Sequence, residues 1–293
     1  MKLFLINSFF LLLVIRITAQ ENITIFEPQK ISNDGVFGLT ISPDGSEAFW
    51  VYSNGGRDTL NILQSHKIKG IWKTGSNASF SDNKNWKDID PMFTPDGKMI
   101  LFQSNRPVEG RQNRKGFDIW AVKKVRNKWS NPYHLGNDIN SDASESFASM
   151  TKNGSIYFMK ENPDGKGKSD IYVSKYLDGK YQIPLLLNST INTTERESNP
   201  FIDKNEKYLI YFSSNPDGFG DVDLYISFNK KGVWTQPVNL GNTINSKLGE
   251  FCPFLHEKEQ KLYFSRTEEL PNKKRKENIY SINFDVNKYL KSK

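Results

Sequence analysis

The chain of 293 residues contains a single cysteine, Cys252, and only three histidines. One cysteine cannot form an internal disulfide, so the fold has to be stabilised by its apolar core. Cys252 lies in the apolar stretch EFCPFL, which indicates a small buried residue rather than a reactive nucleophile. His66, His134 and His256 belong to no zinc or nucleophile-elbow motif, and no catalytic triad can be assembled from the sequence.

The chain has no large excess of charge of either sign, because 40 basic residues stand against 33 acidic ones, for a formal net charge of +7. That excess does not by itself indicate nucleic-acid binding. The basic loops also lack the interleaved aromatic residues on which single-stranded bases stack. We therefore expect no nucleic-acid partner.

The chain also lacks a convincing membrane span. The apolar run Leu3–Ile15 is short for a bilayer, and Arg16 interrupts its end. Lys2 precedes this run and small or polar residues follow it, which is typical of a cleaved export signal over residues 1–20. No cysteine nearby could carry a lipid. The sequence thus predicts an exported protein, periplasmic or secreted, with one domain over residues 21–293 and no transmembrane anchor after cleavage.

What the chain does contain is aromatic residues, at 13%, and many Asn, Ser, Gly and Pro, a composition that favours strands joined by turns. It also repeats itself: LGNDINS begins at Leu135 and LGNTINS at Leu240, 105 positions later. A weaker copy, YQIPLLLNSTINTTERE, begins between them at Tyr181. The period is therefore about 52 residues, which is typical of a repeat architecture.

Each copy contains two apolar segments joined by a polar turn, as in DPMFTPDGKMILFQSN and FASMTKNGSIYFMKEN. Hairpins of this kind begin near Gly38, Asp90, Phe147, Asn199 and Cys252. A third strand follows in segments such as FDIWAVKK and VDLYISFN, and a fourth carries a Trp or Tyr and a Pro. Four short strands in each unit predict an all-β propeller of five blades, with a degenerate sixth between Gly56 and Asp88 as the alternative.

The last hairpin has no fourth strand before the chain ends, and ITIFEPQKIS near the N-terminus carries the missing pattern. We therefore predict that Ile23–Ile31 pairs as the outer strand of the blade that holds Tyr263 and Tyr280, which closes the ring. Aromatic residues recur at one position of the repeat, and we expect them to pack between neighbouring blades: Trp129, Tyr181, Trp234 and, in the first blade, Trp72.

Hairpins of the form SPDG or TPDGKMILFQSN, followed by DIW, DIY or DLY, resemble the repeats of TolB-type, WD-like β-propellers. The resemblance covers essentially all of the chain after the export signal. The family's familiar members have six blades, whereas five repeats are counted here. The resemblance implies a propeller fold but no single function, because such propellers serve both as binding platforms and as accessory domains of enzymes.

One face of the predicted propeller carries the longer loops, and binding residues usually lie on such loops. Acids stand there at the start of four inner strands: Asp88, with Asp90 beside it, Glu145, Glu197 and Glu250. They could form a carboxylate ring at one channel mouth that attracts a cation such as calcium, or the basic group of a peptide; no other cofactor is expected. Alternatively, each acid accepts hydrogen bonds from its own loop, and Lys160 and Arg266 supply positive charge internally.

The loops around that mouth are basic, with Arg106, Arg111, Arg114 and Lys115 in one loop and Lys273, Lys274, Arg275 and Lys276 in another. Such loops are either solvated surface or a site for an acidic or phosphorylated glycan. The segments NPDGKGKSD and NPDGFGDVD space several Asp residues as calcium loops do. Neither has the full acidic ladder with a closing Glu, so ordinary turns are favoured.

Catalytic acids normally occupy positions with distinct environments, whereas these acids recur at one equivalent position of the repeat. The sequence therefore favours an exported, monomeric, non-enzymatic propeller that binds a protein, peptide or glycan partner. Its predicted binding residues are Asp88, Asp90, Glu145, Glu197, Glu250, Arg106 and Arg266. The alternative is a secreted glycan hydrolase or lyase that uses carboxylates among the same acids.

Overall fold

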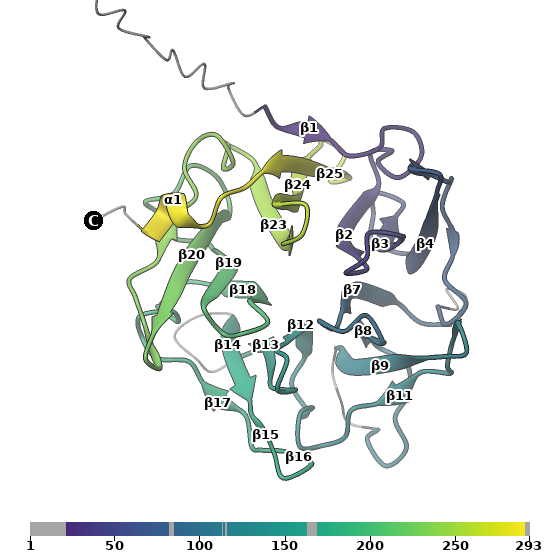
Figure 1. The fold of residues 1–293 in the computed structure, drawn as a ribbon, viewed down its shortest axis with the longest axis vertical. Helices are drawn as coiled ribbons and strands as arrows, with labels where there is room; N and C mark the ends of the chain where they lie inside the picture. The colour runs from purple at the N-terminus through teal and green to yellow at the C-terminus, as the bar shows by residue number, and fades with distance from the viewer. Residues whose placement is uncertain (1–21, 82–84, 113, 115, 163–168, 291–293) are drawn as a thin grey trace, which may run out of the picture.

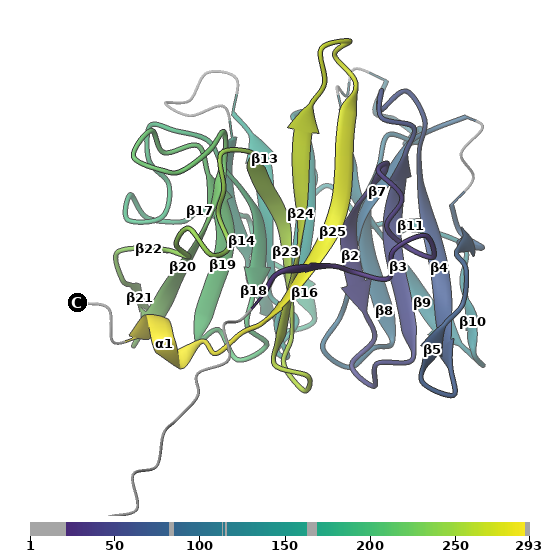
Figure 2. The same ribbon diagram turned by 90° about the horizontal axis from the view of Figure 1, so that it is seen from above.

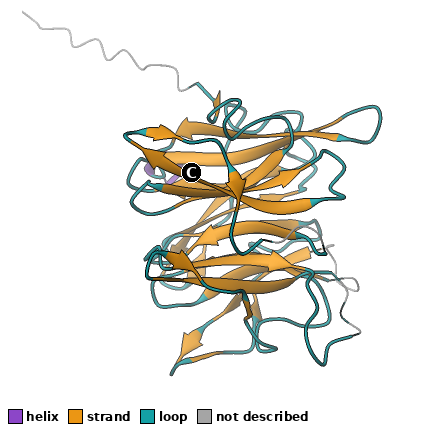
Figure 3. Ribbon diagram, turned by 90° about the vertical axis from the view of Figure 1, so that its right-hand side faces the viewer, coloured by secondary structure: helices purple, strands orange, loops and turns teal. Residues whose placement is uncertain are grey.

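The computed structural model describes residues 22–81, 85–112, 114, 116–162 and 169–290. The predicted export signal and Lys115 of the first basic loop lie outside the described residues. The described chain consists of strands and loops with one short helix, α1 (Asn287–Leu290) (Figure 3). No helix in this part of the chain has the length and apolar character needed to cross a membrane.

Five sheets surround a central axis in chain order (Figure 1). The first blade contains β2 (Val36–Ile41), β3 (Glu47–Ser53), β4 (Leu60–Ile68), β5 (Ile71–Trp72) and β6 (Ser76–Asn77). The second contains β7 (Asp88–Phe93), β8 (Met99–Ser104), β9 (Asp118–Val125), β10 (Lys128–Trp129) and β11 (Tyr133–His134). The third contains β12 (Glu145–Met150), β13 (Ile156–Glu161), β14 (Ser169–Ser174) and β17 (Leu185–Leu186), with a small hairpin of β15 (Tyr176–Leu177) and β16 (Lys180–Tyr181). The fourth contains β18 (Glu197–Ile202), β19 (Tyr208–Ser213), β20 (Asp223–Lys230), β21 (Val233–Trp234) and β22 (Val238–Asn239), and the fifth contains β23 (Gly249–His256), β24 (Lys261–Glu269), β25 (Arg275–Asn283) and β1 (Thr24–Ile25).

The prediction of a five-bladed all-β propeller is confirmed. The segment considered for a sixth blade, between Gly56 and Asp88, supplies β4, β5 and β6 of the first blade in its described part. Strands β2, β7, β12, β18 and β23 are the innermost strands and line the central channel (Figure 1).

The ring is closed by the N-terminal strand, as the sequence predicts. β1 pairs antiparallel with β25, with Ile25 opposite Tyr280. The Phe26 amide then donates to the Ile279 carbonyl at 2.9 Å. The strand is only two residues long, shorter than the expected Ile23–Ile31, and it covers the edge that the fifth blade would otherwise expose.

Tight turns join the first and second strands of the blades. In the second blade the Thr94 hydroxyl donates to Asp96 at 2.7 Å, and the same carboxylate accepts the Lys98 amide at 3.0 Å. Gly97 adopts a φ of 69°, which a residue without a Cβ reaches without strain. The face that carries these turns is therefore compact, whereas longer connections, such as the one between β24 and β25, project from the opposite face (Figure 2).

The repeated aromatic residues pack between neighbouring blades, as expected. Trp129 of the second blade lies 5.7 Å from Phe49 of the first, measured between ring centroids. Trp234 of the fourth blade lies edge-on to Tyr157 of the third, at 6.3 Å and 87°. Equivalent contacts are made by Trp72 and Tyr181. These rings are part of the framework.

The loop that recurs as LGNDINS and LGNTINS closes each blade. Asn140 accepts a hydrogen bond from the Ile119 amide at 2.7 Å and returns one to the Ile119 carbonyl at 3.1 Å. The equivalent pairs are Asn192 with Ile171 and Asn245 with Leu224. The side-chain amide thus takes the place of a strand partner for the third strand, which explains why a polar residue recurs at a buried position.

Candidate active site

Each innermost strand has a bulge near its middle, where the register with its neighbour shifts. One residue of each bulge has a φ between 44° and 65°; these residues are Gly38, Asp90, Phe147, Asn199 and Cys252. The same positions mark the start of the five hairpins in the sequence. The backbone feature belongs to the repeat, but the side chains differ, and Asp90 is the one acid among the five.

The bulge residues of different blades meet at the centre of the ring. The Cys252 amide donates to Asn199 Oδ1 at 3.0 Å, and its thiol donates to Asp90 Oδ1 at 3.5 Å. Gln103 Nε2 donates to Asp90 Oδ2, and Gln103 Oε1 accepts the Phe147 amide at 3.2 Å. Cys252 is buried as predicted, but its thiol contacts polar groups. Asp90 is therefore held by side chains of its own blade and of the fifth.

The Asp90 carboxyl has an unusual acidity. Burial raises its pKa from 3.8 to about 7, the charge of Arg57 opposes this rise, and the charge of Glu277 adds to it. A carboxyl with a pKa near neutral can hold a proton at physiological pH and donate it. Burial and the nearby Asp90 also raise the pKa of the Cys252 thiol well above its usual value, so a reactive thiolate is not formed here.

Arg57 connects this centre to the long-loop face. Its guanidinium carbon lies 4.7 Å from the centroid of the Phe37 ring and 5.7 Å from that of Phe251. It also forms an ion pair with Glu277, which is fully buried. With about a third of its side chain exposed, Arg57 stands close to both Asp90 and solvent.

A polar groove of about 370 Å³ lies beside Arg57 on the same face. Its charged lining residues are Arg57, Arg196, Lys247 and Arg275 on the positive side and Asp221 and Glu269 on the negative side. Phe212 and Phe251 supply apolar surface, and Arg196 lies over the Phe212 ring at 5.2 Å from its centroid. The volume is in the range of small-molecule sites.

The groove contains polar atoms that the protein itself does not satisfy. Within the described ranges, Arg57 Nε and Thr267 Oγ1 are buried and have no hydrogen-bond partner. Arg196, Lys247 and Arg275 form no ion pair with an acid in the described part of the chain. Unpaired buried groups are costly, so these donors are suited to an external ligand that accepts hydrogen bonds or carries negative charge.

The repeated acids lie at the junctions between blades. Glu145 accepts a hydrogen bond from the Ser141 amide at 3.0 Å and forms an ion pair with Lys160 Nζ at 3.7 Å. The negative charge of Asp118, in the preceding blade, raises the pKa of Glu145 further. Equivalent bonds join Thr193 to Glu197 and Ser246 to Glu250. Burial raises the pKa of Asp88, Glu145, Glu197 and Glu250. The three glutamates thus accept hydrogen bonds from their own loops, which was the second of the two interpretations of the sequence. A role of these acids in ligand binding stays a prediction.

Two predicted binding arginines pair with these acids. Arg266 Nε donates to Glu250 Oε1 at 2.6 Å, so it supplies positive charge internally. Arg106 Nη2 donates to Asp88 Oδ1 at 2.7 Å, and only 8% of Arg106 is exposed. The expectation that Arg106 belongs to a solvent-facing basic loop is wrong, because this residue neutralises a buried carboxylate.

The other two arginines of the first basic loop are also engaged internally. Arg111 and Arg114 form ion pairs with the buried Asp118 at 3.1 and 3.2 Å. The second loop stays exposed, with Lys276 3.6 Å from Asp34 and Arg275 lining the groove. Among the described residues of the two basic loops, those of the second loop therefore add to the positive charge of the long-loop face.

No calcium site is evident in the part of the chain that the structure describes. No group of three or more His, Cys, Asp or Glu side chains there is placed to hold a metal ion. In NPDGFGDVD, Asp223 accepts the amides of Phe219 and Gly220 at 2.7 and 3.1 Å, as expected for a turn. The central residues of NPDGKGKSD lie outside the described residues.

Sequence analysis identified Asp90 but not the residues that act on it. Arg57 lies in the connection between β3 and β4, in a segment with no repeat counterpart. The segment ENIY stands where other blades read FDIW, SDIY or VDLY, so Asn278 replaces the repeated Asp and Glu277 precedes it. An acid at a position where the other blades have Phe, Ser or Val was a signal in the sequence, but its meaning depends on Arg57 being folded against it.

The fold is shared with known enzymes. No protein-family model matches the sequence, and no curated protein matches it significantly. An α-L-arabinofuranosidase from Lactobacillus brevis, 13% identical, aligns over 88% of this chain and 95% of its own with a TM-score of 0.54. An endo-arabinase from Bacteroides thetaiotaomicron, 15% identical, aligns over 87% and 95% with a TM-score of 0.54. A further glycoside hydrolase, 9% identical, aligns over 89% and 94% with a TM-score of 0.56.

These comparisons correct the sequence-based interpretation. The propeller is confirmed, but membership of the TolB-type, WD-like binding proteins is not supported: no family model matches, and the three solved structures named above that share this fold are glycoside hydrolases. The expectation of a non-enzymatic binding protein is wrong, and the neighbours favour the alternative, a glycan hydrolase. The argument against catalysis depended on the acids that recur at one position of the repeat. Asp90 does not occupy that position, and its environment differs from theirs.

Proposed function

We propose that this protein is a glycoside hydrolase in which Asp90 donates the proton and the groove beside Arg57 holds the glycan. The observation that carries the proposal is a buried carboxyl at the centre of the ring with a pKa of about 7. The fold shared with an arabinofuranosidase and an endo-arabinase supports the same reaction class.

A glycosidic bond is cleaved when a carboxylic acid protonates the leaving oxygen while water attacks the anomeric carbon. Asp90 transfers its proton to that oxygen as the carbon–oxygen bond breaks. A second carboxylate accepts the proton of the attacking water. Asp221 and Glu269 are the carboxylates that line the groove, and one of them takes this second role.

Arg57 and Glu277 act as positioning residues. Burial is the main cause of the raised pKa of Asp90; the charge of Arg57 lowers this pKa and the charge of Glu277 raises it. Arg57 lines the groove and acts on Asp90, which is not itself a lining residue. The proposal therefore requires the glycan to reach the acid past this guanidinium.

The charge of the groove selects the substrate. Arginine and lysine side chains bind carboxylates through charge-assisted hydrogen bonds, and four such cations line the groove against two acids. The substrate is accordingly a polysaccharide that carries carboxylates, such as a glycan of uronic acids. The export signal expected over residues 1–20 would bring the enzyme to glycans outside the cytoplasm.

The test is release of reducing ends from a panel of neutral and uronic-acid polysaccharides. We expect Asp90→Asn to lower the rate about 100-fold or more, as loss of general acid catalysis does. The variant should fold, because Asn tolerates the positive φ of this position. Asp138→Asn, which changes an exposed acid of the repeated loop, is the matched control and should keep full activity. No cleavage of any polysaccharide, or full activity of folded Asp90→Asn, would refute the proposal.

A further inference from the structure

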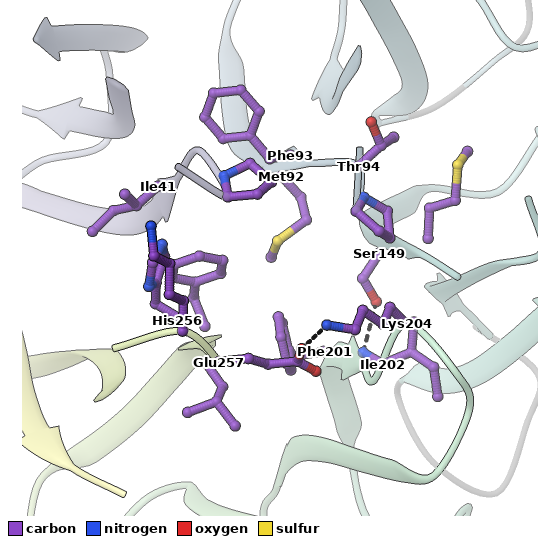
Figure 4. Close-up of a pocket in the computed structure, with 16 residues that line it drawn as sticks. Ile41, Met92, Phe93, Thr94, Ser149, Phe201, Ile202, Lys204, His256 and Glu257 are labelled. Carbon is purple, nitrogen blue, oxygen red and sulfur yellow. Dashed lines mark hydrogen bonds and ion pairs between the residues drawn. The ribbon is translucent and has the colours of Figure 1, made fainter. Parts of the chain in front are cut away.

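A second hollow lies at the other end of the channel, on the tight-turn face. It has a volume of about 150 Å³ and is lined by the C-terminal ends of all five innermost strands and the turns that follow them (Figure 4). Met92, Phe201 and Phe254 are among its lining residues, and each is less than 10% exposed. It is therefore separate from the groove beside Arg57, which opens on the long-loop face.

The interior of this pocket is mostly apolar, and its polar side chains are bonded within the protein. The Ser149 hydroxyl donates to the Pro200 carbonyl at 2.5 Å and accepts the Ile202 amide at 3.0 Å. His256 Nε2 donates to the Ser42 carbonyl at 3.1 Å. Since the polar groups of the lining are engaged within the protein, the part of a ligand that enters the pocket has to be apolar.

The rim is charged. Lys204 forms an ion pair with Glu257, which also accepts the Tyr208 hydroxyl at 3.4 Å (Figure 4). Lys258, at the same rim, is exposed and forms no ion pair among the described residues. The rim therefore leaves one lysine available to an anionic group.

We propose that this pocket binds a small aromatic carboxylate, with its ring among the apolar side chains and its carboxylate at Lys258. The size supports this class of ligand, because an apolar cavity of about 150 Å³ in another protein accommodates one benzene ring. The site is independent of the proposed hydrolase activity and lies at the opposite mouth of the channel.

The experiment measures binding of benzoate, benzyl alcohol and acetate to the mature chain by ligand-observed NMR and calorimetry, up to millimolar concentrations. Benzoate should bind, benzyl alcohol should bind more weakly, and acetate should not bind. Met150→Trp fills the partly exposed edge of the pocket and should abolish binding of both aromatic ligands without loss of the folded state.

The contribution of the rim is tested by Lys258→Gln. An exposed ion pair is weak, so benzoate affinity should fall by up to about fivefold while benzyl alcohol affinity stays the same. Lys207→Gln, on the neighbouring turn but outside the pocket lining, is the matched control and should bind as the unchanged protein does. Absence of benzoate binding, or binding that folded Met150→Trp retains, would overturn the proposal.

Discussion

The blade junctions and the centre of the ring both bury carboxyl groups, but they surround them differently. At a junction, Glu197 accepts the Thr193 amide at 2.9 Å and the hydroxyls of Thr193 and Ser213 at 2.7 and 2.9 Å. At the centre, Asp90 accepts one side-chain amide and one weakly donating thiol. The junction acid is fixed by several hydrogen bonds from its loop and its own blade, whereas the central acid accepts fewer bonds.

Within the repeat, structural residues can thus be distinguished from candidate catalytic residues. Asn192 and Asn245 recur at one position of the repeat and form hydrogen bonds with the backbone of the third strand of their blades. Asp90 and Arg57 depart from the repeat, and burial together with nearby charges gives the Asp90 carboxyl a pKa of about 7. Variants of the first kind should affect stability, and variants of the second kind should affect titration and activity.

The largest effect is expected from removal of residues 22–31. This segment carries Phe26, which packs against Tyr263 at 5.0 Å between centroids, and Ile31, which is 1% exposed. Loss of the buried Ile31 side chain costs about 2–5 kcal/mol, and loss of the partly buried Phe26 ring and of the strand that covers β25 adds to this, so the shortened chain should unfold or aggregate. Thermal unfolding followed by circular dichroism measures this, and an unchanged melting temperature would show that the ring does not need its N-terminal strand.

A smaller effect is expected from Asn245→Ala. The change leaves the buried Leu224 amide without its acceptor, whereas the Leu224 carbonyl still accepts the Leu240 amide at 3.0 Å. A buried unpaired group costs about 1–3 kcal/mol. Asn242→Ala, an exposed residue of the same loop, is the control. Urea unfolding should separate the two variants by about 1–3 kcal/mol. Equal stability would mean that the repeated asparagine does not hold the blade together.

The most specific effect is expected from Asp90→Asn in the pH dependence of stability. The folded pKa of about 7 lies above the ordinary value of 3.8, so between these values the folded state binds more protons than the unfolded state. Stability from this group is greatest below about pH 4 and falls as pH rises to 7. The free energy of unfolding of Asp90→Asn should fall less steeply with pH across this window.

The control for this titration is Asp138→Asn, which should retain the slope of the unchanged protein. The junction acids also have raised pKa values and contribute to the slope in both proteins, so the comparison of the two variants isolates Asp90. Parallel profiles for Asp90→Asn and the unchanged protein would remove the distinction between the central acid and the junction acids.

Much of the framework follows from the sequence alone. The period of about 52 residues, the hairpins and the recurring aromatic position predict five blades, and the pattern in ITIFEPQKIS predicts how the ring closes. These features depend on local spacing, and a repeat presents the same local spacing several times. The burial of Trp234 and the pairing of the N-terminal segment with the blade that holds Tyr280 could therefore be predicted without coordinates, whereas the register, with Ile25 opposite Tyr280, comes from the structure.

The candidate site was decided by the tertiary structure. Asp90 meets Cys252, 162 positions away in the sequence, and its acidity depends on Arg57 of the first blade and Glu277 of the fifth. The sequence around Arg106 predicts a basic surface loop, yet this side chain is buried and forms an ion pair with Asp88. Residue type and spacing set which groups are present, but burial and the distance between charges determine their pKa values, and both arise only when the ring closes.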